Sequence, residues 1–174
     1  LQGATASEES ETSEAAARFQ RAVALYREGG YDGALAEFRK AYQLSPSYRV
    51  LYNIAQAQYA LHDFVGAHKS LTKYMNEGGT EIPSDRRRQV DEMVSKLSDR
   101  IARIQITTNA DGADIRIDDV SVGLSPLHDS VPVNVGTRKV SAFKSGSPEM
   151  FRVVTVAGKE NLKIDLRIDE QPRP

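Results

Sequence analysis

The sequence predicts an α+β chain of two domains, in which a short array of helical hairpins with a capping helix precedes a small antiparallel β-sandwich. Three observations support this prediction. The first half repeats itself at a spacing of 33 residues, the period of the apolar residues changes from 3.6 to 2 at Ile104, and turn signals then recur at short intervals. Repeats of this length are typical of stacked helical hairpins, and short alternating segments between turns are typical of β-sandwiches.

The repeat places small and aromatic residues at fixed offsets. The small residues would allow two helices to approach closely, and the aromatic residues would fill the space beside them. In the alignment of the two units, Ala22, Tyr26, Tyr31, Ala34, Phe38 and Ala41 match Ala55, Tyr59, Phe64, Ala67, Leu71 and Tyr74.

Helix boundaries follow from caps and breakers. Ser13 is a predicted N-cap, the glycine pairs at 29–30 and 78–79 end helices, and Ser45-Pro46 stops another. The acidic residues before Ser13 predict a solvated, flexible arm over residues 1–12. The predicted helices cover residues 13–28, 31–44, 48–61, 64–76 and 85–103.

The fifth predicted helix differs from the other four. Its apolar stripe is narrow and runs through Val90, Met93, Leu97, Ile101 and Ile104, and it lacks the small residues of the repeat. Its opposite face is charged, so we expect a capping and connecting helix that ends the helical domain, 13–103. Arg86-Arg87-Arg88 fits a solvated face better than a phosphate site, because acidic residues flank it and no aromatic residue lies among the arginines.

Residues 15–77 resemble the tetratricopeptide (TPR) repeat family. The signature offsets of the first unit are occupied by Ala22, Leu25, Tyr31, Ala34, Phe38, Ala41 and Pro46. The second unit matches through the run L-Y-N-I-A at 51–55 and then through Phe64, Ala67 and Leu71. It departs from the pattern at Gln58, which stands where Leu25 stands in the first unit, and at Tyr74, where a small residue is usual.

The TPR resemblance implies a concave face lined by the first helix of each hairpin, which binds a segment of a partner protein. Lys and Asn form the carboxylate clamp of some TPR domains, and only Asn53 matches that pattern, which argues against a clamp here. Tyr26 and Tyr59 fit either the groove or packing between helices. The expected groove residues are Phe19, Gln20, Val23, Tyr26, Arg27, Arg49, Tyr52, Asn53, Gln56 and Tyr59.

The second half resembles the PEGA family of small envelope-associated β-domains. The resemblance rests on A-D-G-A-D-I-R-I-D-D at 110–119, V-G-L-S-P-L at 122–127 and V-G-T-R-K-V at 135–140. It implies a β-domain over residues 104–169 with a tail at 170–174. A TPR region followed by a PEGA domain is a pairing of bacterial cell-envelope proteins. We therefore expect export to the periplasm or envelope, which the N-terminal Leu1 in place of Met also favours.

No catalytic, metal or cofactor site is expected. The chain has no cysteine and only three histidines, and no phosphate-binding loop occurs. His62 and His68 are spaced wrongly to share a metal on one helix face. The aspartates at 111, 114, 118 and 119 fit turns better than calcium.

The sequence thus predicts a non-enzymatic scaffold that binds a protein partner in the helical groove. A net charge of −1 argues against nucleic acid as a partner, and no apolar run is long enough to cross a membrane. Two alternatives stay open. The β-domain could bind a glycan of the envelope, although Phe143 and Phe151 are its only aromatic residues. The chain could also self-associate, since two hairpins are fewer than a solenoid usually needs.

Overall fold

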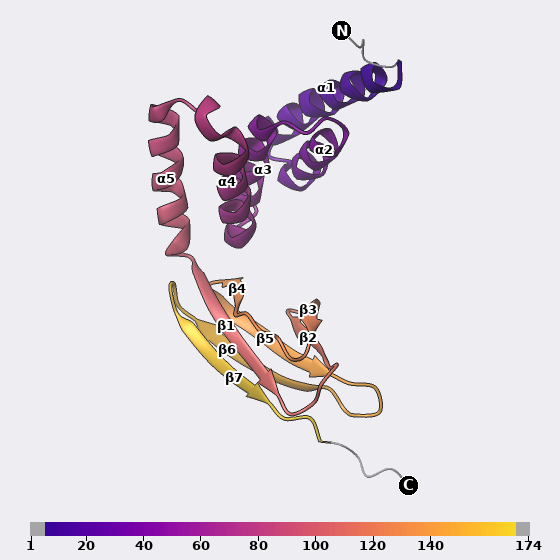
Figure 1. The fold of residues 1–174 in the computed structure, drawn as a ribbon, viewed down its shortest axis with the longest axis vertical. Coiled ribbons are helices and arrows are strands. Elements are labelled where there is room, and N and C mark those ends of the chain that lie inside the picture. Colours follow the sequence, from indigo (N-terminus) through magenta and orange to yellow (C-terminus); the bar gives the residue numbers. More distant parts are fainter. Residues whose placement is uncertain (1–5, 170–174) are drawn as a thin grey trace. The chain divides into compact units, whose positions relative to one another are not determined.

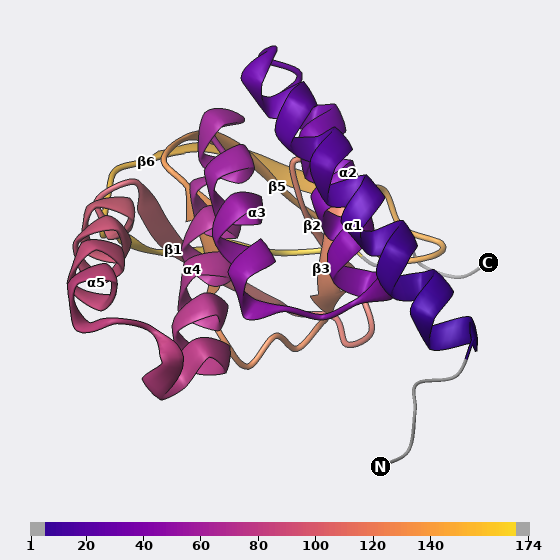
Figure 2. The same cartoon turned by 90° about the horizontal axis from the view of Figure 1, so that it is seen from above.

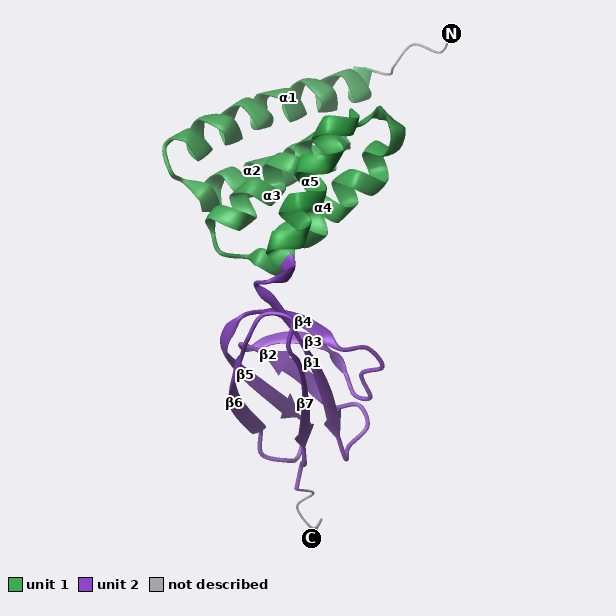
Figure 3. Cartoon of the chain, turned by 90° about the vertical axis from the view of Figure 1, so that its left-hand side faces the viewer, with its two compact units in different colours: residues 1–97 green, residues 98–174 purple. Residues whose placement is uncertain are grey.

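A computed structural model describes residues 6–169 of the chain. The chain divides into two compact units, residues 1–97 and 98–174 (Figure 3). The first unit is helical and the second consists of strands, which confirms the predicted two-part α+β architecture. The division falls before residue 98, earlier than the boundary predicted at 103–104.

Five α-helices form the first unit (Figure 1). The helix α1 packs on α2, α2 on α3, and α3 on α4, so the chain forms two consecutive hairpins that Figure 2 shows in a row leading to α5. A short 3-10 turn, Gly79–Glu81, separates α4 from α5. The helices are α1 (Ala6–Arg27), α2 (Tyr31–Leu44), α3 (Tyr48–Ala60), α4 (Phe64–Gly78) and α5 (Ser84–Ser98).

Two predicted helix ends were wrong. The helix α1 begins at Ala6, so the part of the expected flexible arm from residue 6 to residue 12 is helical. Glu8 and Glu9 lie in its first turn, where negative charge stabilises the N-terminus of a helix. The helix α5 ends at Ser98, and residues 101–108 form a strand. Residues 1–5 and the predicted tail at 170–174 lie outside the described residues.

The small residues of the repeat lie at the helix contacts. Ala22 and Ala34 are fully buried, and their counterparts Ala55 and Ala67 are nearly so. Phe38 and Leu71, the large residues at equivalent positions, are buried beside them. At the end of α4, a Cβ on Gly78 would come within 2.7 Å of the Tyr48 ring and closer to Ile82, so only glycine permits this approach.

Two departures from the repeat pattern are accommodated by specific contacts. Gln58 is buried, and its side-chain oxygen accepts a hydrogen bond of 2.6 Å from the Ser70 hydroxyl. Tyr74 is buried between Tyr48 and Tyr52, with ring centroids 5.5 and 5.8 Å away. A polar pair and an aromatic cluster therefore replace the apolar contacts of the first hairpin.

Seven strands form two sheets in the second unit. One sheet has the order β4-β1-β7 and the other has the order β3-β2-β5-β6. The strands are β1 (Ile101–Thr108), β2 (Asp114–Ile117), β3 (Val120–Leu124), β4 (Val131–Asn134), β5 (Gly136–Phe143), β6 (Met150–Val156) and β7 (Asn161–Leu166).

The strand pairings are antiparallel with one exception. The strands β1 and β7 run parallel, with Ile104 opposite Leu162 and Ile106 opposite Ile164. The sequence period shows which residues face inward but not the direction of a neighbouring strand, so this parallel pair was not predicted. Inward-facing residues of both sheets form one core, which includes Ala102, Ile104, Ile106, Ile115, Ile117, Val140, Ala142, Val156, Ile164 and Leu166.

Candidate functional site

The residues predicted to line the helical groove all lie on α1 and α3, and they differ in exposure. Gln20, Arg27, Arg49 and Tyr59 are exposed, and the remaining six are partly buried. Tyr59 keeps 49% of its surface exposed although its ring contacts Phe64 at a centroid distance of 5.6 Å. The partly buried residues are Phe19, Val23, Tyr26, Tyr52, Asn53 and Gln56.

Two of these residues are engaged within the helical unit. The Phe19 ring packs edge-on against Phe38 of α2 at 5.4 Å, so this side chain contributes to the contact between α1 and α2. The Asn53 amide donates to the backbone oxygen of Arg49, one turn earlier on the same helix, at 3.3 Å. Neither side chain is therefore fully available to a partner.

Tyr52, one of the predicted groove residues, contacts α5. Its ring lies beside Tyr74, and its hydroxyl donates to the Met93 sulfur at 3.9 Å. The Arg86 guanidinium lies over the same ring, with its central carbon 4.6 Å from the ring centroid. Since Arg86 and Met93 belong to α5, this helix extends the surface formed by α1 and α3.

Tyr26 links α1 to this group. Burial raises the pKa of the Tyr26 phenol, and the nearby phenols of Tyr31 and Tyr52 raise it further. Its ring also lies 5.1 Å from the Tyr31 ring. Tyr26 thus packs against the start of α2 and interacts electrostatically with Tyr52 of α3.

Sequence analysis missed the contribution of α5 to this surface. The sequence predicts Met93 on the apolar stripe of the helix and Arg86 on its solvated face. One signal was available, since Met93 and Arg86 lie two turns apart on α5 and can meet one aromatic residue. The sequence does not identify Tyr52 as the aromatic residue that they contact, because Tyr52 is distant from both in the chain.

Three arginines on these helices carry charge without a counterion among residues 6–169. Arg27, Arg49 and Arg86 form no ion pair with any residue from 6 to 169. Arg49 instead lies over the Tyr48 ring at 5.1 Å. By contrast, Arg18 and Arg21 of α1 both bind Glu37 of α2, at 3.1 Å. The arginines of the candidate surface are therefore open to an external anion.

The clustered aspartates of the β-unit bind protein donors. Asp114 accepts from Ser121 and Arg116, which in this order lower the pKa of its carboxyl. Asp118 accepts from the backbone N–H of Lys139 and from Arg138, while Asp119 pairs with Lys139 at 2.8 Å. Asp118 and Asp119 have φ values of 50° and 67°, as a tight hairpin turn requires. These contacts stabilise the turn between β2 and β3.

The described residues offer neither a metal cluster nor a membrane span. Between residues 6 and 169, no group of three or more histidine or acidic side chains is placed to hold a metal ion. Within the same range, each helix is too short or too polar to cross a bilayer.

Comparison with known proteins finds a similarity for the β-unit. The comparison with curated proteins gives no match. Residues 101–172 match the model of the PEGA domain family, a segment that begins with β1 and contains all seven strands. The resemblance seen at residues 110–140 is thus confirmed, and the segment that follows the five helices is similar to a PEGA domain.

Proposed function

We propose that this protein is a non-enzymatic scaffold that binds an acidic segment of a partner protein on the surface formed by α1, α3 and α5. We further propose that the two hairpins are tetratricopeptide repeats, in which the first helix of each hairpin faces the partner. The observation that carries the proposal is the contact of Tyr52 with both Arg86 and Met93, which joins α3 to α5.

The chemistry of this surface suits protein recognition. Tyrosine and arginine are the residues that most often supply binding energy in protein interfaces. Tyr52 is held between Tyr74 and Arg86, so little side-chain entropy remains to be lost on binding. Arg27, Arg49 and Arg86 have no counterion in the described part of the chain, and a partner segment with carboxylates would supply one.

The proposed location is the bacterial cell envelope. Its support is the PEGA match together with the helical hairpins that precede it, a combination typical of envelope proteins. In this setting the helical unit holds a protein segment, and the PEGA-like unit provides a second, separate surface.

Site-specific photo-crosslinking tests the proposed function. Benzoylphenylalanine introduced in place of Gln56 should give a discrete adduct with a partner in cells that express the chain. The same group in place of Lys40, an exposed residue of α2, should give none. Charge reversal at the surface, Arg49→Glu with Arg86→Glu, should abolish the adduct.

The matched control reverses two charges elsewhere. Arg39→Glu with Lys40→Glu changes the net charge equally on the exposed face of α2 and should leave the Gln56 adduct intact. Equal yields of adduct from positions 40 and 56 would show that the binding surface lies elsewhere. So would an equal loss of the Gln56 adduct with both pairs of charge reversals.

A further inference from the structure

We propose that the free edge of β6 accepts an extended peptide strand in which apolar side chains alternate with acidic ones. This surface belongs to the β-unit, and the proposal is independent of the helical groove. It rests on four features of β6: its unpaired edge, its regular geometry, its exposed apolar face and an unpaired arginine on its inner face.

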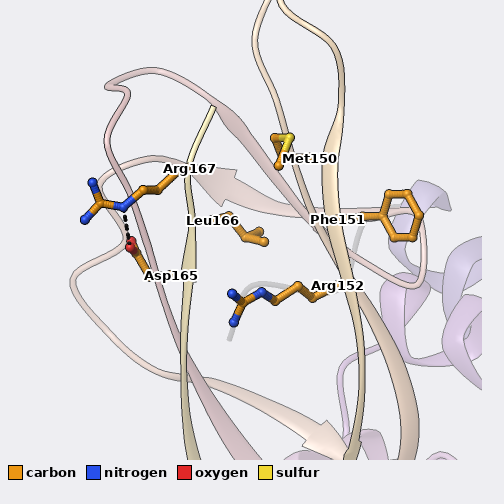
Figure 4. A pocket seen from close by; sticks show the side chains of 6 residues that line it. All are labelled: Met150, Phe151, Arg152, Asp165, Leu166 and Arg167. Carbon is orange, nitrogen blue, oxygen red and sulfur yellow. Dashed lines mark hydrogen bonds and ion pairs between the residues drawn. The ribbon is translucent and has the colours of Figure 1, made fainter. Parts of the chain in front are cut away.

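The edge lies beside a cavity between the two sheets. The strand β6 is the last strand of one sheet and β7 is the last strand of the other, and no ladder joins them. A cavity of about 250 Å³ lies between them and is lined by Met150, Phe151, Arg152, Asp165, Leu166 and Arg167 (Figure 4). Alternate residues of an edge strand direct their N–H and C=O groups away from the sheet, where an added strand can bind them.

Among the sheet edges of the described residues, β6 is regular, as β7 is, whereas β3 and β4 are not. The pairing of β6 with β5 has no register shift from Met150 to Val156. The strand β6 itself contains neither proline nor glycine. By contrast, β4 has four residues and contains Pro132, and β3 contains Gly123 beside a register shift. Proline, glycine and irregular pairing all weaken the addition of a further strand.

The outer face of β6 carries two adjacent apolar side chains that are more than half exposed. Phe151 and Val153 are 57% and 60% exposed, and they lie opposite Ser141 and Lys139 of β5. The Lys139 ammonium group lies 5.6 Å from the centre of the Phe151 ring. An added strand would place side chains on the uncovered side of both residues, and β-branched or aromatic ones would bury the most surface there.

The inner face of β6 carries a charge where a core residue would be expected. Arg152 lies opposite Val140, which is fully buried, and Figure 4 shows its side chain reaching from β6 toward β7 and Leu166. The Arg152 side chain is exposed and forms no ion pair or hydrogen bond with any residue from 6 to 169. The nearby Asp165 is already bound by Arg167 and by the Thr107 hydroxyl, each at 3.1 Å.

The charge of Arg152 selects the strand that binds. An inward-pointing charge on an edge strand opposes addition of an apolar strand, because the guanidinium would be buried without a partner. A strand with a carboxylate on its inner face would remove this cost through a paired hydrogen bond to the guanidinium. The favoured ligand therefore alternates apolar outer residues with an acidic inner residue.

Peptide selection with the full chain tests this inference. Random seven-residue peptides displayed on phage should yield binders with Asp or Glu flanked at alternate positions by Val, Ile or aromatic residues. Selection against Arg152→Glu should replace the acidic residue by Lys or Arg. The same charge change at an exposed residue of β7, Lys163→Glu, should leave the acidic preference unchanged.

Backbone pairing is tested with a synthetic copy of the best selected peptide. Hydrogen exchange should slow at alternate amides of β6 when the peptide is added, and N-methylation of the peptide backbone at the pairing positions should weaken binding roughly tenfold. The groove variant Arg49→Glu with Arg86→Glu should bind the peptide as the wild type does, which separates this test from that of the proposed function.

Four results would overturn the inference. The first is an unchanged acidic preference with Arg152→Glu, and the second is amide protection on α1 and α3 in place of β6. The third is protection of β6 in concentrated protein that disappears on dilution, which would identify a second copy of the chain as the occupant. The fourth is binding of cell-wall glycan fragments at Phe151 without protection of β6 amides.

Discussion

Arg86 of α5 lies over the ring of Tyr52 of α3, at 4.6 Å from the ring centroid. The same ring contacts the Tyr74 ring of α4, and the Tyr52 hydroxyl donates a hydrogen bond to the Met93 sulfur. A cation over an aromatic face is attracted by the ring quadrupole, and the exposed position of Arg86 keeps this term near the low end of its range. Tyr52 therefore joins three helices, and its ring rather than its hydroxyl makes most of the contacts.

Substitutions of Tyr52 should separate the contribution of its ring from that of its hydroxyl. We expect Tyr52→Ala to lower the free energy of unfolding of the helical unit by about 2 kcal/mol, because the contacts with Tyr74, Met93 and Arg86 are lost together. Tyr52→Phe keeps the ring and should change stability by less than about 0.5 kcal/mol. Urea unfolding followed by far-ultraviolet circular dichroism at the helix band measures both. An equal loss in the two variants would show that the hydroxyl dominates.

The buried alanines of the repeat should resist enlargement. Ala34 is fully buried between helices, so Ala34→Leu should destabilise the helical unit by about 1–3 kcal/mol through overpacking. Ala36 is exposed two residues later on the same helix, and Ala36→Leu adds the same volume where there is room. The difference between the two urea midpoints is the measurement. Similar midpoints would contradict the packing at this repeat position.

Local patterns predicted the hairpins but could not predict all boundaries. The small residues at 22 and 34 and the large residue at 38 are buried, as close helix packing requires. The sequence predicts a helix up to residue 103, because Leu97, Ile101 and Ile104 fit a helical spacing. Its inward residues in the structure are Ala102, Ile104 and Ile106, which alternate as in a strand.

Contacts between segments that are distant in the chain could not be predicted from local sequence patterns. The Asn109 side chain exchanges hydrogen bonds with the backbone of Ile168, 59 residues away, and so fixes the chain just after β7. The contact of Arg86 with Tyr52 is of the same kind, since a charged helix face gives no sign of the ring that it covers. The inner position of Arg152 depends on the register of β6 with β5, which no motif of the sequence specifies.

The carboxyl of Asp114 should titrate below its ordinary range. Its pKa is lowered first by the Ser121 hydroxyl and then by Arg116, from an ordinary value of 3.8. A lowered folded-state pKa means that the carboxylate stabilises the β-unit above about pH 4, and that this contribution is lost as the pH falls toward the folded-state pKa. Ser121→Ala removes the largest cause, so the pKa of Asp114 should rise toward 3.8.

Carbon-13 chemical shifts of the Asp114 carboxyl, followed against pH in both proteins, check this expectation. The acid side of the stability profile should also become less steep in the Ser121→Ala variant, because the folded and unfolded states then differ less in bound protons. Ser121→Ala should change the free energy of unfolding only slightly, since the hydrogen bond between Ser121 and Asp114 lies at the protein surface. An identical titration in the two proteins would show that Ser121 does not hold the carboxylate.

The contributions of Gln58 and Ser70 to the free energy of unfolding should be strongly coupled. The Ser70 hydroxyl donates to the side-chain oxygen of Gln58 at 2.6 Å, and Gln58 is only 5% exposed. Removal of the hydroxyl in Ser70→Ala leaves a buried acceptor unpaired, and should cost about 1–2 kcal/mol of unfolding free energy. The equivalent position of the first hairpin holds Leu25, so an apolar residue at 58 is compatible with the repeat.

The double variant Gln58→Leu with Ser70→Ala removes both polar partners and should therefore be more stable than Ser70→Ala alone. Urea unfolding of the wild type, both single variants and the double variant completes a thermodynamic cycle, with an expected coupling of about 1 kcal/mol or more. The side-chain nitrogen of Gln58 contacts Asp63 only at 3.5 Å, so its loss in Gln58→Leu should contribute little. Additive effects of the two single substitutions would mean that the hydrogen bond is not what accommodates a polar residue at this buried position.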